Sequence, residues 1–311
     1  MINRALLRIK IIQIIYSYYK SEGNSIPAAE KELFYSIEKT YQLYFNLLWL
    51  SVKITDFAAL KIDSKRNKLR PTDEDLNPNT RFIDNLFIKQ LGRNNQLKEL
   101  LKEYNFSLES QGDIVKHLYD NIVEADFYKE YMEASATSYD EDKELWRKIY
   151  KKVFLVNEEL YETVEDLNIY LTDDLEVIIS FVIKTIKRFK ETEGPNQMLL
   201  PMFKDDADKN FASKLLTTSL KNGSDYRQMI DIHTKNWELD RIAFMDIVIM
   251  EAALAEITSF PTIPINVTLN EYIEISKSYS TEKSAIFING VLDNIVRELK
   301  ADNKLIKVMK I

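Results

Sequence analysis

The 311-residue sequence contains no cysteine, which excludes disulfide bonds, thiolate metal sites and a cysteine nucleophile. Its six glycines and seven prolines are few for this length, and such a composition favours long helices over a sheet with many turns. No apolar run approaches the length of a membrane span. The first twenty residues are apolar but carry Arg4, Arg8 and Lys10 within them, unlike a signal peptide. We therefore expect a cytoplasmic protein.

The residue patterns typical of enzymes are also missing. His117 and His233 are the only histidines, and neither has carboxylates at the helical spacing of a metal site. No Gly-x-Gly pair and no Walker loop occur, so phosphate-binding loops of the common nucleotide-binding types are absent. The sequence therefore predicts a non-enzymatic protein without a cofactor or a metal.

The composition is that of a soluble globular protein, with 45% hydrophobic and 29% charged residues. The net charge is −7, but the two ends of the chain are basic. Residues 1–20 hold four basic residues and no acidic one, and residues 300–310 hold four lysines against Asp302. These ends indicate either a local RNA-binding patch or solvated termini, and charge alone does not decide between the two.

Hydrophobic periodicity predicts an all-α fold. Residues 3–20 are apolar on nearly all sides, so we expect neighbours to bury this helix on several faces. Residues 65–80 read as an exposed loop and 191–201 as a linker. The remaining helices are predicted at 28–60, 81–104, 110–133, 140–156, 158–190, 211–220, 226–232, 239–257, 268–275 and 284–300.

Two local signals add detail to this assignment. Thr268 with Glu271 three residues later is the pattern of a capping box, which predicts a helix start at Thr268. Gly290 lies inside the last predicted helix, where glycine is unfavourable by about 1 kcal/mol relative to alanine. We expect Gly290 to allow the close approach of a neighbouring helix.

Three stretches of the last hundred residues form a distinctive set: Trp237–Ile242, Ile265–Glu271 and Phe287–Asp293. Their sequences and their order resemble those of the NusB family of transcription antitermination factors. Arg8, Gln13 and Tyr16 add a weaker match, because their spacing is that of the family's first helix. The resemblance covers about 130 residues in two unequal pieces.

The resemblance implies a fold of two small helical bundles and a function in RNA binding. Members of the family bind the boxA element of leader transcripts together with NusE, a ribosomal protein, in an antitermination complex on RNA polymerase. By similarity, the RNA-binding residues are expected to be Arg4, Arg8, Lys10, Lys283 and Phe287. The partner-binding residues are expected to be Tyr16, Asn270, Glu271 and Glu274.

The sequence also departs from the family. Lys283 stands where an acidic residue is common, and Glu251 stands where an arginine is common. The chain is more than twice the typical length. We therefore assign residues 1–22 to the first helix of a NusB-like double bundle, 23–202 to a long helical insertion and 203–311 to the rest of that core.

Two other functions fit parts of the sequence. A NusB-like domain also precedes the catalytic domain of an RNA cytosine methyltransferase family, but this chain has no cysteine and ends about twenty residues after Asn289. The second alternative is a helical interaction scaffold that has kept the fold but lost boxA binding. Lys283, Glu251 and the acidic charge support that alternative.

Overall fold

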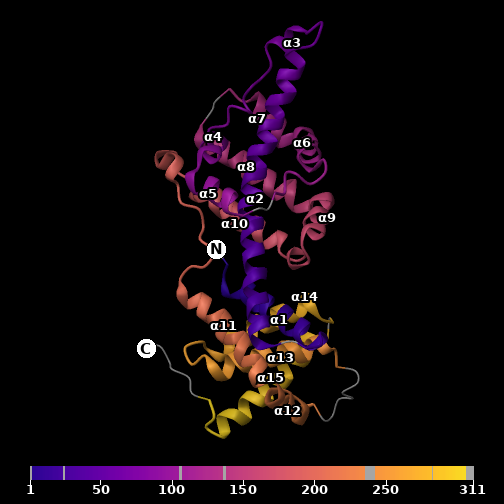
Figure 1. Cartoon of the computed structure of the whole chain (residues 1–311), viewed down its shortest axis with the longest axis vertical. Helices are drawn as coiled ribbons and strands as arrows, with labels where there is room; N and C mark the ends of the chain where they lie inside the picture. Colours follow the sequence, from indigo (N-terminus) through magenta and orange to yellow (C-terminus); the bar gives the residue numbers. More distant parts are fainter. Residues whose placement is uncertain are drawn as a thin grey trace. The chain divides into compact units, whose positions relative to one another are not determined.

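A computed structural model describes residues 2–23, 25–104, 107–135, 138–234, 242–281 and 283–305. Within these ranges every regular element is a helix, which confirms the predicted all-α fold (Figure 1). The α-helices are α1 (Arg4–Lys20), α2 (Ile26–Arg66), α3 (Asp73–Leu76), α4 (Leu86–Arg93), α5 (Asn95–Glu103), α6 (Ile114–Glu124), α7 (Asp126–Glu133), α8 (Tyr139–Lys152), α9 (Glu158–Leu167), α10 (Leu175–Arg188), α11 (Asp206–Lys221), α12 (Gly223–His233), α13 (Phe244–Ser259), α14 (Ile265–Tyr279) and α15 (Ser284–Ala301). Short 3-10 helices are η1 (Phe154–Val156), η2 (Ile169–Leu171) and η3 (Glu191–Asn196).

The chain forms two compact units. Unit 1 contains Glu38–Met202, and unit 2 contains Ile2–Ile37 together with Phe203–Ile311. The insertion that the sequence suggested over residues 23–202 overlaps unit 1, whereas residues 23–37 lie in unit 2. Helix α2 therefore contributes its first residues to unit 2 and the longer remainder to unit 1.

Unit 1 is built around α2. The other helices of the unit surround this helix in Figure 1, and its Tyr44, Leu47 and Leu48 are fully buried. The Tyr150 hydroxyl, from α8, donates to the Leu47 carbonyl oxygen at 2.6 Å. The Tyr44 hydroxyl lies 2.6 Å from the Thr185 hydroxyl of α10. Large aromatic side chains thus fill the core, and their hydroxyl groups are hydrogen-bonded as burial requires.

Helix α2 is long and apolar enough to span a membrane by length and composition alone, so the expectation that no apolar run approaches that length was wrong. However, 67% of its most apolar window is buried inside the structure. Its apolar face therefore packs against protein, as expected for a core helix.

Asparagine side chains divide helices that the sequence analysis predicted as continuous. Asn85 accepts from the Ile88 amide at 3.0 Å, Asn94 from the Leu97 amide at 2.9 Å, and Asn168 from the Tyr170 amide at 3.0 Å. Each caps the first turn of a new helix, because the side-chain oxygen satisfies an amide that has no helical partner. The predictions of single helices over 81–104 and 158–190 were therefore wrong. Helix α2 also continues to Arg66, beyond the predicted end at residue 60.

Unit 2 is organised around α13, which contacts α1, α11, α12, α14 and α15. Residues Val248 to Ile257 of α13 are all buried. A helix that is apolar on every side needs neighbours on every side, and the small side chains of Ala252, Ala253 and Ala255 leave room for them. Helix α1 is also buried on several faces, as its sequence predicted: eight of its 17 residues are buried.

Helix α14 begins one turn before the predicted start. It runs from Ile265, with Pro264 at the N-cap position, so Thr268 lies inside the helix. The Thr268 hydroxyl donates to Glu256 and the Glu271 carboxylate accepts from Arg8, and neither side chain caps α14. The capping-box prediction was wrong because both side chains have tertiary partners.

Candidate nucleic-acid interface

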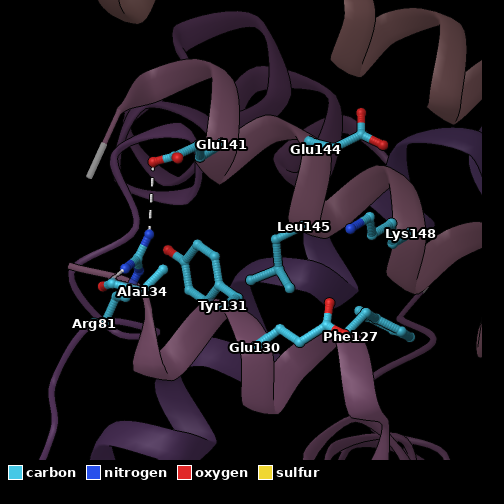
Figure 2. Close-up of a pocket in the computed structure, with 9 residues that line it drawn as sticks. All are labelled: Arg81, Phe127, Glu130, Tyr131, Ala134, Glu141, Glu144, Leu145 and Lys148. Carbon is cyan, nitrogen blue, oxygen red and sulfur yellow. Dashed lines mark hydrogen bonds and ion pairs between the residues drawn. The ribbon is translucent and has the colours of Figure 1, made fainter. Parts of the chain in front are cut away.

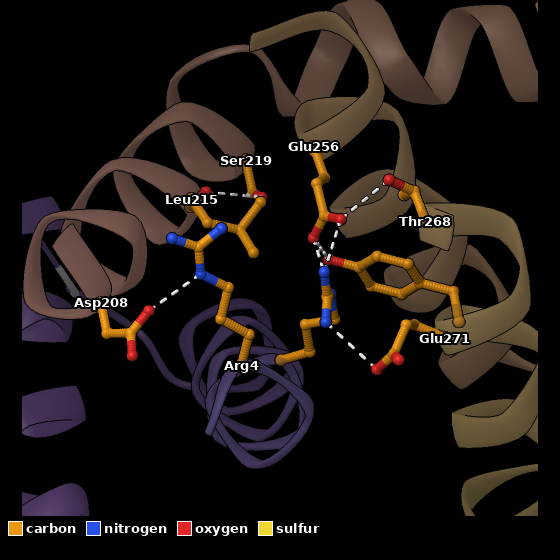
Figure 3. Close-up of polar contacts among 9 residues, drawn as sticks. Arg4, Asp208, Leu215, Ser219, Glu256, Thr268 and Glu271 are labelled. Atoms are coloured by element: carbon orange, nitrogen blue, oxygen red, sulfur yellow. Dashed lines mark hydrogen bonds and ion pairs between the residues drawn. The ribbon is translucent and has the colours of Figure 1, made fainter. Parts of the chain in front are cut away.

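Helix α1 carries the three basic residues that the sequence analysis assigned to RNA binding. The Arg4 side chain pairs with Asp208 at 2.9 Å (Figure 3). It is 39% exposed, and its guanidinium lies 4.9 Å from the centre of the Phe211 ring. Arg8 and Lys10 are 4% and 1% exposed. Only Arg4 of the three therefore presents charge near the surface.

Arg8 forms a buried ion pair with Glu256 of α13. The Nε and Nη2 atoms of Arg8 donate to the two oxygens of Glu256, each at 2.8 Å, and Nη1 donates to Glu271 at 3.1 Å. This two-point geometry matches a planar guanidinium to a carboxylate. Burial by itself lowers the pKa of a guanidinium, but the hydrogen bonds and charge of Glu256 outweigh it and raise the pKa of Arg8. Arg8 is therefore charged and held in place.

The Glu256 carboxylate, which is fully buried, is the centre of this cluster. In addition to Arg8, it accepts from the Thr268 hydroxyl at 2.8 Å and from the Tyr272 hydroxyl at 3.3 Å. Figure 3 shows Glu256, Thr268 and Glu271 converging from α13 and α14. The cluster joins α1, α13 and α14, and its buried charges are compensated as they must be in a dry interior.

This burial changes the interpretation of Arg8 and Lys10. Their side chains are in the interior of unit 2, so neither is placed where a phosphate group could reach it without a rearrangement of the fold. We assign Arg8 to holding α1 in position. Sequence reasoning placed Arg4 and Arg8 on one helical face, but it could not identify Glu256, which is 248 residues away in the chain.

The beginning of α15 carries the other predicted RNA-binding residues. A pocket of about 500 Å³ lies beside Lys283 and Phe287, and its other lining residues are His233, Ile286, Gly290, Val291 and Asn294. Lys283 is exposed, Phe287 is half-buried and Ile286 is 82% exposed. His233, from the end of α12, has its Nε2 atom 2.8 Å from a Glu298 oxygen. The pocket therefore combines an apolar surface with a cation at its edge.

Gly290 borders this pocket and does not contact another helix. A Cβ atom added at Gly290 would have no neighbouring heavy atom within 4 Å. The prediction that Gly290 allows a neighbouring helix to approach was therefore wrong. Gly223 has that property, because an added Cβ there would overlap the Tyr19 hydroxyl and lie 2.9 Å from Glu251 Oε1.

The predicted partner-binding residues lie on α1 and α14. Tyr16 is 36% exposed, its ring is 5.5 Å from the Phe244 ring, and Lys20 extends over both rings. Asn270 and Glu274 are exposed on α14. Glu271 is half-exposed and already bound to Arg8.

These groups occupy two ends of unit 2. Arg8 meets Glu256 near the end of α13, whereas Tyr16 meets Phe244 at its start. The hydroxyl of Ser284, at the start of α15, donates to Asp246 at 2.9 Å, which fixes Lys283 near that same start. Glu256 and Asp246 are ten residues apart, or about 15 Å along a helix. Tyr16 and Lys283 therefore lie toward one end of α13, and Arg4 toward the other.

Glu251, which departs from the family pattern, has a partner inside this fold. Its carboxylate is fully buried, accepts from Arg227 Nε of α12 at 3.0 Å and accepts from the Tyr19 hydroxyl. Burial raises the pKa of Glu251, although the bonds from Tyr19 and Arg227 oppose that shift. Arg227, which sequence reasoning missed, supplies a cation beside the acidic side chain.

Comparison with known proteins agrees with the motifs. The NusB family model matches residues 182–297. The transcription antitermination protein NusB of Salinibacter ruber is 34% identical over 132 residues, a match that covers 40% of this chain and 82% of that protein. Its namesake from Koribacter versatilis is 35% identical over 141 residues, covering 39% and 97% respectively. The chain belongs to the NusB family.

A further NusB relative, from Bacillus licheniformis, is 36% identical over 106 residues, which cover 34% of this chain and 82% of that protein. No solved structure matches the chain significantly. The NusB match begins at residue 182, within α10, and includes α11–α15 up to residue 297. Of the three motif stretches, Ile265–Glu271 and Phe287–Asp293 lie on α14 and α15. In the first stretch, residues 237–241 lie outside the described residues.

Proposed function

We propose that this NusB-family protein binds boxA-type leader RNA together with the ribosomal protein NusE. The complex would join an RNA polymerase antitermination assembly in the cytoplasm, and the role involves no catalysis. Membership of the NusB family carries this proposal, because its curated relatives are transcription antitermination proteins. The pocket at the start of α15 supports it with chemistry suited to RNA.

Single-stranded RNA is bound by cations that contact phosphates and by aromatic or apolar surfaces that hold unstacked bases. Lys283 and Phe287 provide both beside one pocket. Its volume of about 500 Å³ lies within the range of small-ligand pockets, so one unstacked base is a suitable occupant. We assign RNA contact to Lys283, Phe287 and Arg4, and we exclude the buried Arg8 and Lys10 from it.

The NusE contact is assigned to two exposed surfaces. Tyr16 and Phe244 form an aromatic surface with Lys20 above it, and aromatic side chains are enriched at interfaces. Asn270 and Glu274 form a polar surface on α14. Glu271 is expected to contribute less, because its carboxylate already accepts from Arg8.

Fluorescence anisotropy with labelled boxA RNA tests the proposal directly. We expect tighter binding with NusE than without it, and weaker binding of a scrambled RNA. The variant Tyr16→Ala should lower the effect of NusE and leave the affinity for RNA alone unchanged. Equal affinity for boxA and scrambled RNA, with NusE present, would refute the proposal.

A scaffold without boxA binding remains the second candidate. The burial of Arg8 and Lys10 favours it, because it leaves α1 with fewer cations at the surface than its sequence suggested. The salt dependence of RNA binding distinguishes the two candidate functions. A boxA-binding protein should retain sequence preference as salt increases, whereas a scaffold should show only weak, sequence-independent binding that salt abolishes.

A further inference from the structure

The net charge of the protein is confined to unit 1. Residues 38–202 contain 23 basic and 30 acidic residues, whereas residues 2–37 and 203–311 contain 19 of each. Unit 1 therefore has a charge of −7 and unit 2 is neutral. A negative surface repels nucleic acid and attracts basic proteins. Unit 1 is thus suited to a partner different from the one proposed for unit 2.

Unit 1 has a groove between α7 and α8 (Figure 2). The groove encloses about 210 Å³, and Phe127, Tyr131 and Leu145 line it with apolar surface. Glutamates stand along both sides: Glu130 on α7, and Glu141 and Glu144 on α8. Lys148 lies at one end and Arg81 at the other.

The glutamates differ in how far they are neutralised. Glu141 lies 3.6 Å from Arg81, and Glu144 pairs with Arg147. Glu130 is exposed and has no ion pair among the residues that the structure describes. A basic side chain entering beside Glu130 would therefore find a carboxylate with no cation bound to it.

Arg81 provides a second, independent indication of a ligand. Its side chain is only 8% exposed, its guanidinium lies 4.3 Å from the Tyr131 ring centre, and one of its nitrogens donates to the Ala134 carbonyl oxygen. Its Nε atom is buried and has no hydrogen-bond partner within the described chain. A buried donor without an acceptor is costly, so an acceptor from a ligand would be favourable.

The acceptor that fits Arg81 is a neutral one. The lining carries three glutamates against two basic residues, Arg81 and Lys148, so a phosphate or carboxylate would add to an excess of negative charge. A main-chain carbonyl oxygen would accept from Arg81 without adding negative charge. We propose that the α7–α8 groove docks a lysine- and arginine-rich segment of a partner protein. An apolar side chain of that segment packs against Phe127 and Tyr131, a basic one pairs with Glu130, and a carbonyl oxygen accepts from Arg81 after a small rotation.

Labelled peptides test this with the full-length protein. The probes are a nonapeptide of alternating lysine and arginine with a central leucine, the same peptide with a central serine, and a glutamate nonapeptide with a central leucine. We expect the basic leucine peptide to bind about tenfold more tightly than the serine peptide, because burying part of a leucine side chain is worth about that factor. The glutamate peptide should not bind.

Two matched variants locate the site. Glu130→Lys should weaken binding of the leucine peptide by at least about fivefold, because an ion pair is replaced by repulsion. Glu99→Lys makes the same charge change at an exposed position on α5, outside the groove, and should leave the affinity within about twofold of the parent, as distant surface changes do. Arg81→Lys keeps the charge and removes the unpaired Nε donor, so it should also weaken binding. If Arg81→Lys does not fold, the other two variants decide.

Three outcomes would overturn the proposal: equal binding of the leucine and serine peptides, equal effects of Glu130→Lys and Glu99→Lys, or binding of labelled oligouridine that Glu130→Lys strengthens. The last would show that the groove is a nucleic-acid site. Binding of boxA RNA, measured on the same variants, should not change, so failure here is distinguishable from failure of the function proposed for unit 2.

Discussion

Replacing Arg8 with alanine distinguishes a buried structural role from RNA contact. Among the residues that the structure describes, the change leaves the fully buried Glu256 carboxylate with hydrogen bonds only from Thr268 and Tyr272. Removing one partner of a buried ion pair typically costs about 3–5 kcal/mol, because the other charge stays buried. For a folding unit of this size the midpoint of thermal unfolding should fall by roughly 6–20 °C.

The control is Arg4→Ala. The Arg4 side chain is 39% exposed and its pair with Asp208 is near the surface, so its loss should cost no more than about 1 kcal/mol. Urea unfolding followed by circular dichroism measures both free energies, and hydrogen exchange of the α1 and α13 amides shows where stability is lost. Adding Glu256→Gln to Arg8→Ala should restore part of the loss, since no uncompensated charge then remains.

Similar unfolding free energies for Arg8→Ala and Arg4→Ala would refute this account of the cluster. RNA binding gives an independent check. Folded Arg8→Ala protein should keep the salt dependence of the parent. A slope reduced by about 0.7, the value for one phosphate contact on a single strand, would mean that Arg8 reaches RNA after all.

Three further predictions follow from the same geometry. Glu251→Gln should stabilise the protein at pH 7. Burial raises the folded pKa of Glu251, so the stability of the parent protein falls as pH rises above the unfolded pKa of about 4.5. Urea unfolding at pH 4 and pH 7 should therefore show a gain for the variant only at pH 7. Gly223→Ala should lower the free energy of unfolding by about 1–3 kcal/mol, because the added Cβ meets Tyr19 and Glu251. Gly290→Ala should raise it by about 0.5–1 kcal/mol. Thermal unfolding of the two variants tests both directions. Lys283→Glu should leave the melting temperature unchanged and weaken boxA binding in anisotropy, and normal RNA affinity would place the RNA surface elsewhere.

Much of the fold could be predicted from local sequence. The apolar residues around all sides of α1 and α13 indicated helices buried on several faces, and the structure confirms this. The helix predicted over 284–300 is α15, Ser284–Ala301. These predictions succeeded because helical periodicity and burial depend on residues within a few turns of one another.

Helix boundaries were less predictable. Asn94 and Asn168 look like ordinary polar residues within longer periodic stretches, but each caps a new helix. Thr268 has the sequence of a cap and forms none, because its hydroxyl bonds to Glu256 instead. Whether a short polar side chain satisfies its own backbone or a distant group depends on which groups the tertiary fold brings near.

The sequence by itself determined that the protein is helical, which residues form its apolar helices and which family its motifs resemble. Only the tertiary structure decided the roles of the polar residues. It placed Arg8 against Glu256, 248 residues away, and it crowded Gly223 while leaving Gly290 open. The physical reason is that apolar periodicity is a property of one helix, whereas the partner of a buried charge, or the space beside a glycine, belongs to a neighbour that the local sequence does not specify.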